Sequence, residues 1–423
     1  MPSAKDAMPP TEAVSWPDAQ RKSRFDHWLT ALPVELGLLP GTLRPASADA
    51  SFRRYLRIDS SAGASCIVMD APPEHENCRP FVQVAQLMRD AGLLVPDILA
   101  WDEPQGFMLL SDLGHQTLLD VIDPANPQAH HAQYMAALDS LLAWQLASQP
   151  GVLPPYDEAL LRRELQLFPD WYLQKHRSFD PAAEQAQTLY KAFDSIVKRN
   201  LAAPMVYVHR DYMPRNLMIP RGIVDPHAPP LRGSLPPEGA DSPWGGPAAN
   251  RDPHAPPLRG SLPPEGADSS WGGPAANRSS PAQQLGVLDF QDAVYGPITY
   301  DVASLMRDAF LTWEEDFVID VTVRYWEKAR KAGLMDFEDW HSDFGAFYRA
   351  VEWMGLQRHL KVAGIFARLT LRDGKPKYLA DTPRFIHYIR NTTHRYRELG
   401  PFLKLIDQVE GLEAASGFAF GRV

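Results

Sequence analysis

Residues 206–219 read VYVHRDYMPRNLMI and form the most informative segment of this 423-residue chain. The apolar residues at its two ends predict two short strands, and the tripeptide His209-Arg210-Asp211 begins the loop between them. Asn216 ends this loop, with four residues between it and Asp211. A loop of this length between two strands can direct a carboxylate and an amide into the same site.

A second apolar segment, LGVLDFQD at residues 285–292, predicts another strand that delivers Asp289 at its end. Asn216 and Asp289 are 73 positions apart, but two consecutive copies of a 27-residue repeat, residues 225–278, account for 54 of these positions. The remaining 19 positions are typical of two strands joined as a hairpin, so the repeats lie at its tip, where long loops are tolerated.

The repeats at 225–278 are rich in Pro, Gly, Ala and Ser, and such a composition cannot offset the entropy of ordering. We therefore expect a disordered insertion. A proline-rich ligand for a partner is one interpretation of this segment. A duplicated and tolerated loop is the simpler one, because the two copies differ at only one position, Pro243 against Ser270.

The motifs together indicate phosphoryl transfer, a reaction that depends mainly on positioning and charge neutralisation. Asp211 is the candidate catalytic base for the acceptor hydroxyl. Asn216 and Asp289 are candidate ligands of Mg²⁺ on the phosphates of ATP. A chance His-Arg-Asp tripeptide in a surface loop is the alternative, and the offset of Asn216 and the flanking strands argue against it.

The composition narrows the class of protein. A net charge of −10 disfavours nucleic acid and anionic membrane surfaces as partners. The two cysteines, Cys66 and Cys78, do not form a disulfide framework. Residues 1–23 contain no continuous apolar stretch of the kind that a signal peptide needs. We expect a cytoplasmic protein.

A strand-rich beginning and a helix-rich remainder predict an α+β protein with two lobes. We expect a first helix at Arg21–Leu32, strands at Phe52–Ile58, Cys66–Met69 and Phe107–Leu110, and a helix at Pro80–Asp90. Further helices are expected at Ala132–Ala147, Pro181–Asn200, Val302–Leu311, Phe317–Ala332, Phe337–Phe366 and Thr382–Gly411. The expected divisions are a disordered N-terminus (1–20), a strand-rich N-terminal lobe (21–112) and a helical C-terminal lobe (113–423) that contains the catalytic loop and the insertion.

The HRDxxxxN loop and the strand ending in Asp289 resemble the aminoglycoside phosphotransferase family, which has the protein-kinase-like fold. The resemblance covers nearly everything from about Arg21 onward, except the insertion. It is closer still to the anomeric kinases of N-acetylmuramate and N-acetylglucosamine in bacterial cell-wall recycling. Four stretches carry this closer resemblance: ASFRRYLRI (50–58), VMDAPPE (68–74), CRPF (78–81) and DFQDAVYGPITYDVASLMRDA (289–309).

The resemblance implies further roles. Asp211 is the base, Asn216 and Asp289 bind Mg²⁺, and His209 and Arg210 support the catalytic loop. Asp301 braces this loop; capping a helix that starts at Val302 is the plain alternative, and the two roles are compatible. The nucleotide-covering hairpin corresponds to residues 48–53, which include Ser51, and the hinge beside the adenine site to residues 107–114.

The chain also departs from the family pattern. The strand lysine that pairs with phosphates is missing from Cys66–Asp70, where Met69 or Asp70 stands near its place. Gln83 and Gln86 stand where the partner glutamate would be. We expect Arg53 or Arg54 to supply the missing positive charge, because a guanidinium suits phosphate. Ordinary strand-surface arginines are the alternative.

The acceptor is expected on the C-terminal helices that face Asp211. Glu352 and Arg358 are the candidates, the latter for the lactyl carboxylate of muramate. A solvated or salt-bridged helix face is the plain alternative for both residues. Three other functions stay open at this point: a kinase of an aminoglycoside- or choline-like compound, a nucleotide-binding pseudokinase and a protein kinase.

Overall fold

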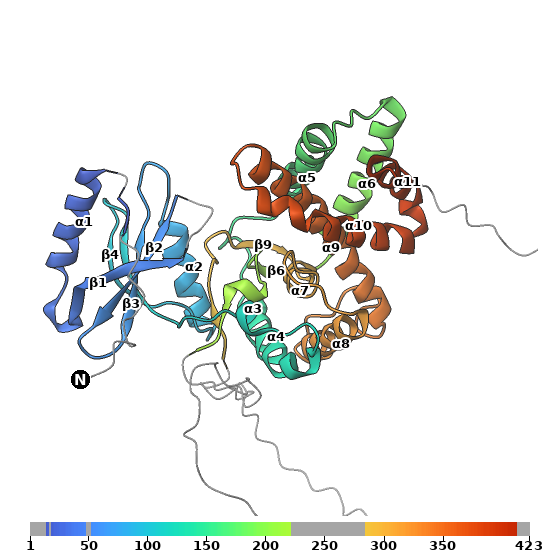
Figure 1. Cartoon of the computed structure of the whole chain (residues 1–423). Helices are drawn as coiled ribbons and strands as arrows, with labels where there is room; N and C mark the ends of the chain where they lie inside the picture. Colours follow the sequence, from blue (N-terminus) through green and yellow to red (C-terminus); the bar gives the residue numbers. More distant parts are fainter. Residues whose placement is uncertain (1–13, 17, 48–51, 221–283, 413–423) are drawn as a thin grey trace, which may run out of the picture. The chain divides into compact units, whose positions relative to one another are not determined.

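The computed structural model describes residues 14–16, 18–47, 52–220 and 284–412, and these belong to one unit of the chain (Figure 1). The repeats at 225–278 lie outside the described residues, so their disorder stays a prediction. Trp16 is described, and its ring packs on Phe25 with 4.7 Å between the ring centroids. The folded chain therefore begins before residue 21, where the sequence predicts its start.

An antiparallel five-stranded sheet forms the N-terminal lobe, residues 14–16, 18–47 and 52–112, in the strand order β1-β2-β3-β5-β4. The sequence predicts both helices and three strands of this lobe but not β1 and β4. These two are edge strands with irregular register, and β1 contains two prolines, which edge strands tolerate. The elements are α1 (Ala19–Ala31), β1 (Leu38–Ser47), β2 (Arg54–Ser60), β3 (Ser65–Asp70), α2 (Arg79–Asp90), β4 (Ile98–Asp102) and β5 (Phe107–Ser111).

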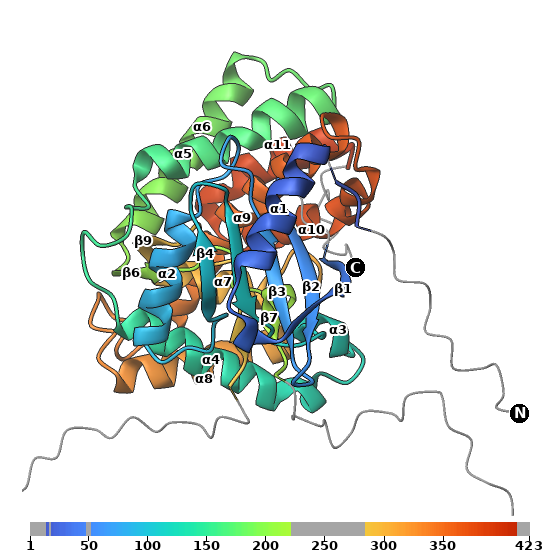
Figure 2. The ribbon, with the colours of Figure 1, turned by 90° about the vertical axis from the view of Figure 1, so that its left-hand side faces the viewer.

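The two faces of this sheet have different neighbours, because side chains alternate along each strand. Leu56 and Val68 pack with Phe25 of α1, which lies across this face (Figure 2). Met69 points to the opposite face and belongs to the main core with Phe81 of α2. We call these the α1 face and the α2 face, and a residue's place in its strand determines which face it lies on.

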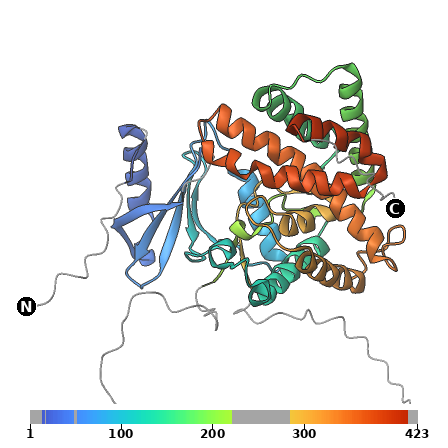
Figure 3. The same cartoon turned by 45° about the vertical axis from the view of Figure 1, so that its right-hand side comes forward.

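Helices dominate the C-terminal lobe, residues 113–220 and 284–412, in which α9 and α10 lie side by side (Figure 3). Three predictions need correction. The predicted helix 302–311 begins three residues earlier and ends at Met306, α9 begins at Phe344 rather than Phe337, and the predicted helix 382–411 is two helices separated at the extended residue Tyr396. The elements are α3 (Leu118–Val121), α4 (His131–Leu146), α5 (Glu158–Leu167), a π-helix (Phe168–His176), α6 (Ala183–Ala202), α7 (Thr299–Met306), α8 (Glu315–Lys331), α9 (Phe344–Leu371), α10 (Thr382–Arg395) and α11 (Gly400–Glu410).

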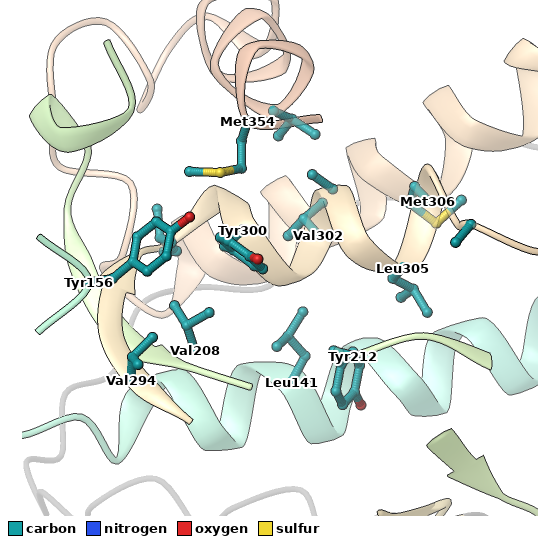
Figure 4. Close-up of a cluster of buried hydrophobic side chains, with 14 of the residues drawn as sticks. Leu141, Tyr156, Val208, Tyr212, Val294, Tyr300, Val302, Leu305, Met306 and Met354 are labelled. Carbon is teal, nitrogen blue, oxygen red and sulfur yellow. The ribbon is translucent and has the colours of Figure 1, made fainter. Parts of the chain in front are cut away.

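Two small ladders position the loop with the HRDxxxxN motif. Strand β6 (Met205–Val208) pairs with β9 (Val294–Pro297), and β7 (Leu217–Met218) pairs with β8 (Gly286–Val287). The second pair confirms the predicted hairpin. Figure 4 shows Val208 and Val294 facing Tyr300 of α7, so the ladder and this helix share one core. Within the described ranges, no helix is both long and apolar enough to cross a membrane.

Candidate active site

Two hydrogen bonds to Asp301 hold the start of the catalytic loop, which we define as residues 209–216. The backbone N–H of His209 donates to Oδ2 of Asp301 at 2.7 Å, and that of Arg210 donates to Oδ1 at 3.0 Å. Because α7 begins at Thr299, Asp301 lies in its first turn and is not the cap of a helix starting at Val302. Burial raises the pKa of Asp301 to about 6, although His209 and the two N–H donors act in the opposite direction.

The buried imidazole of His209 links the catalytic loop to the chain after β8. Its Nδ1 accepts the N–H of Asp211 at 3.3 Å, so Nε2 carries the hydrogen and donates to the carbonyl oxygen of Leu288 at 2.9 Å. Burial lowers the pKa of His209, which keeps the ring in this neutral form. Since Leu288 directly precedes Asp289, this ring ties the Asp211 and Asp289 segments together.

The side chain of Asp211 is half-buried, and its carboxylate accepts no hydrogen bond from the described part of the chain. Burial alone raises the pKa of this carboxyl, but the nearby cations Lys361, Arg358 and Arg210 outweigh burial and lower it. Asp211 is therefore ionised at neutral pH, and its oxygens can accept the proton of a hydroxyl. A general base has these properties.

Asn216 and Asp289 lie together at the end of the β7–β8 ladder. Nδ2 of Asn216 donates to the carbonyl oxygen of Asp211 at 2.8 Å and lies 3.4 Å from Oδ2 of Asp289. The amide oxygen of Asn216 is thus left without a hydrogen bond from the described residues. An amide oxygen beside a carboxylate suits Mg²⁺, which usually takes few protein ligands and completes its shell with phosphate and water.

This small ligand number agrees with the surroundings of the pair. In the described ranges, no three His, Cys, Asp or Glu side chains gather to hold a metal by themselves. The backbone of Asp289 is left-handed, at φ +63°, and so is that of Arg210, at φ +78°. Such conformations cost about 1–3 kcal/mol in non-glycine residues and concentrate at functional sites.

Helix α9 carries both predicted acceptor contacts, and the structure keeps them apart. Glu352 forms an ion pair with Arg395 of α10. Arg358 instead donates from Nη1 to the carbonyl oxygen of Arg210 at 2.6 Å. Arg358 therefore belongs to the surroundings of the catalytic loop, whereas Glu352 belongs to a separate network between α9 and α10.

The central turns of α9 are buried on all sides, so this helix has no solvated polar face there. Glu352, Arg358 and Lys361 are only 5%, 4% and 8% exposed. Lys361 pairs with Glu164 of α5, a residue that the sequence does not single out. Lys361 could have been identified from the sequence, because it is a charged residue on a strongly apolar helix. No comparable feature of the sequence indicates Glu164.

Arg54 lies on the α1 face, away from the predicted phosphate site. Arg54 is the cross-strand partner of Asp70 in the β2–β3 ladder. The fully buried carboxylate of Asp70 accepts hydrogen bonds from both Arg54 and Arg21 of α1. The guanidinium of Arg54 also donates to the carbonyl oxygen of Ser15. These contacts do not support a phosphate role for Arg54.

Arg53 has a different position. It donates to Oε2 of Glu76 at 3.0 Å. Arg53 lies two residues before Tyr55, and Tyr55 is the cross-strand partner of Met69 on the α2 face. Arg53 directly precedes β2, and extending the alternation of β2 by this one residue places it toward the α2 face, near the place where the strand lysine is missing. Ser51 lies outside the described residues.

The remaining N-terminal residues occupy structural roles. Gln83 donates to the carbonyl oxygen of Val152, and Gln86 donates to Asp90 within α2. In the segment predicted as the hinge, Asp112 accepts hydrogen bonds from Arg57 at 2.7 Å and from Ser65 at 2.6 Å. Arg57 is a second cation on the α2 face, which strict alternation from Tyr55 would have indicated.

Fold and site together define a phosphotransferase with a kinase-type catalytic loop. A profile of the phosphotransferase enzyme family matches residues 42–226 and 279–341, on both sides of the repeats. The chain belongs to this family.

Two curated relatives match almost the whole chain. The N-acetylmuramate/N-acetylglucosamine kinase of Pseudomonas aeruginosa is 42% identical over 408 residues, which cover 94% of this chain and 99% of the relative. The protein of the same name from Neisseria meningitidis is 39% identical over 403 residues, or 95% of this chain and 100% of the relative. These relatives and the family confirm the prediction of a small-molecule kinase.

Solved structures confirm the predicted fold. The ethanolamine kinase of Plasmodium vivax superposes with a TM-score of 0.50 at 8% identity, over 87% of each chain. An amicoumacin kinase in complex with AMP-PNP and Ca²⁺ gives a TM-score of 0.50 at 13% identity, over 88% of this chain and 95% of the other. At such identities the likeness concerns the fold, which is the α+β kinase fold with a strand-rich and a helical lobe.

Proposed function

We propose that this protein uses ATP to phosphorylate the anomeric hydroxyl of N-acetylmuramate and N-acetylglucosamine in cell-wall recycling. The observation that carries the proposal is the grouping of Asp211, Asn216 and Asp289 in a chain 39–42% identical to kinases named for these sugars. The identity extends over nearly the full length of both chains, so it includes the helices that contact the acceptor in this proposal.

The reaction follows from the state of Asp211. The anomeric hydroxyl gives its proton to this carboxylate while its oxygen attacks the γ-phosphorus of ATP. A new O–P bond forms, the bond from the γ-phosphorus to the β,γ-bridging oxygen breaks, and ADP leaves with that electron pair. The two bonds to Asp301 and the ring of His209 hold the loop, so that Asp211 is in place before the reaction.

Asn216 and Asp289 are the proposed ligands of Mg²⁺, which supplies positive charge that neutralises the phosphates. Their orientation is fixed by the surrounding chain. Gln291 donates to Oδ1 of Asp289 at 2.8 Å, and the carbonyl oxygen of Asp211 holds the amide of Asn216. Metal dependence would appear as loss of transfer on chelation and recovery with Mg²⁺.

Arg53 is the proposed source of the phosphate contact that a strand lysine would make. Its pair with Glu76 resembles a lysine–glutamate pair in charge, and both side chains are only 12% exposed. We expect Arg53→Ala to raise KM for ATP and lower kcat, and Arg53→Lys to recover part of the loss. Unchanged nucleotide kinetics in Arg53→Ala would remove this residue from the site.

The test of the proposal is a transfer assay with ATP and Mg²⁺. N-acetylmuramate, N-acetylglucosamine, an aminoglycoside and choline are offered in parallel, and phosphorus NMR identifies the phosphorylated position. An anomeric phosphate of either amino sugar supports the proposal. Transfer only to another acceptor refutes the substrate assignment, and nucleotide binding without any transfer identifies a pseudokinase.

A further inference from the structure

Arg215 is the second arginine of the catalytic loop, and its surroundings differ from those of the first. Arg210 forms an ion pair with Glu164 of α5 at 2.5 Å, and Glu164 is only 5% exposed. Arg215 is exposed, and its guanidinium forms no hydrogen bond or ion pair with the described residues. Because nothing in the described part of the chain occupies its N–H donors, they can bind a ligand.

An aromatic ring restricts the guanidinium of Arg215. Its Cζ lies over the ring of half-buried Phe310, 4.8 Å from the centroid, on the segment that follows α7. The backbone of Phe310 is held in turn, because its N–H donates to Oδ1 of Asp308 at 3.1 Å. A cation is attracted to the face of an aromatic ring, and the N–H groups of a guanidinium lie in its own plane and stay accessible. A side chain that is restricted before the ligand arrives loses less entropy on binding.

The loop brings Arg215 and Asp211 close together along the chain. Nδ2 of Asn216 donates to the carbonyl oxygen of Asp211 at 2.8 Å, and the N–H of Asn216 donates to the carbonyl oxygen of Met213 at 2.8 Å. These two bonds fold residues 211–216 into a compact turn. The three side chains between Asp211 and Arg215 are buried, whereas Arg215 reaches the surface. An acceptor whose hydroxyl contacts Asp211 therefore extends past a long, charged side chain on the same turn.

An acceptor that carries a carboxylate needs a cation at this place. Asp211 and Asp289 carry carboxylates, and ATP adds the negative charge of its phosphates, so a further anion is repelled. Arg358 and Lys361 of α9 are only 4% and 8% exposed, and both are bound to other groups of the protein. Arg215 differs from these two cations because it is exposed and can meet the acceptor directly.

The two sugars of the proposed function differ in this charge. N-acetylmuramate carries a lactyl ether with a carboxylate at C3, two ring carbons from the anomeric carbon, whereas N-acetylglucosamine has a hydroxyl there. A guanidinium binds a carboxylate through two parallel N–H···O bonds, and such charge-assisted bonds are roughly twice as strong as neutral ones. The hydroxyl of N-acetylglucosamine offers no equivalent partner.

We propose that Arg215, held by Phe310, binds the lactyl carboxylate of N-acetylmuramate and so determines the preference for this sugar over N-acetylglucosamine. The inference rests on the proposed function, because it concerns how the same site recognises one of its two acceptors. It assigns to an exposed arginine the contact that the sequence predicts for Arg358, whose Nη1 is instead bound to the carbonyl oxygen of Arg210.

The experiment measures kcat/KM at saturating ATP and Mg²⁺ for N-acetylmuramate, the methyl ester of its carboxylate and N-acetylglucosamine. The proteins are the wild type, Arg215→Met, Arg215→Lys, Phe310→Leu and Arg163→Met. For each protein, the values for the acid and for the ester are divided by the value for N-acetylglucosamine, which removes any loss that a change in the catalytic loop imposes on all acceptors. Arg163, an exposed arginine of α5, provides the matched change of charge away from the site.

For Arg215→Met we expect the acid ratio to fall about tenfold to a hundredfold, because a hydrogen-bonded charge pair is lost. The ester ratio should change less than about threefold, since the ester has no charge to lose. Arg215→Lys should recover part of the loss, because lysine keeps the charge without the fork. Phe310→Leu should lower the acid ratio about twofold to fivefold, and Arg163→Met should leave both ratios unchanged.

An acid ratio that Arg215→Met does not lower, or lowers no further than the ester ratio, would overturn the inference and identify an ordinary surface arginine. Should Arg215→Met not fold, the same comparison is made with Arg215→Lys, whose acid ratio must still fall below that of the wild type while its ester ratio does not.

Failure of this inference is separable from failure of the proposed function. Wild-type transfer to both amino sugars, with an acid ratio that does not depend on Arg215, refutes only the role of this residue. Wild-type transfer to N-acetylglucosamine alone also refutes that role and leaves an amino-sugar kinase. No transfer to either sugar refutes the proposed function and this inference together.

Discussion

The substitution Asp301→Asn replaces the carboxylate that accepts the N–H groups of His209 and Arg210 by an amide of nearly the same size. Only the amide oxygen accepts, so one N–H keeps its bond and the other faces an NH₂ donor. Leaving one buried backbone donor unpaired costs about 1–3 kcal/mol. Geometry alone therefore predicts a moderate loss of stability.

Removing the charge of Asp301 has the opposite effect. Burial raises the pKa of this carboxyl from 3.8 to about 6, and a shift of about 2 units corresponds to about 3 kcal/mol. Because the pKa is raised in the folded state, the favourable contribution is fully present below pH 3.8 and is lost as the pH rises through 6. At pH 7.5 the ionised carboxylate thus destabilises the fold, and asparagine avoids this cost.

The two terms nearly cancel, so we expect the unfolding free energy of Asp301→Asn to lie within about 2 kcal/mol of the wild type at pH 7.5. When the pH is lowered from 7.5 to 4, the wild type should gain about 3 kcal/mol of unfolding free energy relative to Asp301→Asn. Denaturant unfolding at several pH values measures both quantities. Stability that changes identically with pH in the two proteins would show that Asp301 does not titrate as burial demands.

Catalysis should respond differently from stability. A loop held by one bond instead of two no longer fixes Asp211, so kcat at saturating ATP should fall about tenfold to a hundredfold, equivalent to about 1.4–3 kcal/mol. The control is Asp292→Asn, an exposed side chain on the neighbouring segment, which should keep wild-type kcat. Wild-type turnover in Asp301→Asn would refute the bracing role.

Three further predictions test other parts of the molecule. Asp211→Asn should abolish turnover while calorimetry still detects nucleotide binding, because the base acts in the chemical step; retained kcat would exclude it. Gly364→Ala should destabilise the fold by about 1–3 kcal/mol in denaturant unfolding, since the new Cβ lies 2.3 Å from the carbonyl oxygen of Leu167. The matched change Gly355→Ala, with its nearest neighbour 3.8 Å away, should be neutral or stabilise by up to about 1 kcal/mol, and equal effects of the two changes would contradict the packing argument. Deleting residues 225–278 should leave the melting temperature and kcat nearly unchanged, because the pairs of the β7–β8 ladder, Leu217 with Val287 and Met218 with Gly286, lie outside the deleted segment; a large loss would show that the repeats contribute contacts.

Local patterns were sufficient for the elements that carry the chemistry. The apolar segments around the HRDxxxxN loop are strands, and removing the repeats from the count predicts the hairpin that places Asn216 beside Asp289. These features depend on short-range spacing, which a single sequence displays. The edge strand β1 was missed for the opposite reason, because Pro40, Gly41 and Pro45 interrupt any alternation.

Arg53, directly before β2, and Arg54, its first residue, show what local patterns cannot predict. Arg53 and Arg54 are neighbours in the sequence and equally plausible as phosphate ligands, yet alternation sends them to different faces of the sheet. Which face meets α1 depends on tertiary packing, and Asp70, buried under α1, determines that Arg54 pairs there. The sequence predicts the alternation but not the partner.

The burial and ion pairs of Glu164 are still harder to predict from the sequence. Its partners Gln357 and Lys361 follow it by 193 and 197 positions, and α5 itself was not predicted. On an isolated amphipathic helix, a glutamate is a surface residue by default. It is a buried anion because α9 covers it while Lys361 and Arg210 neutralise its charge. Burial and charge therefore explain each other at this site, and neither can be inferred from the sequence before the other is known.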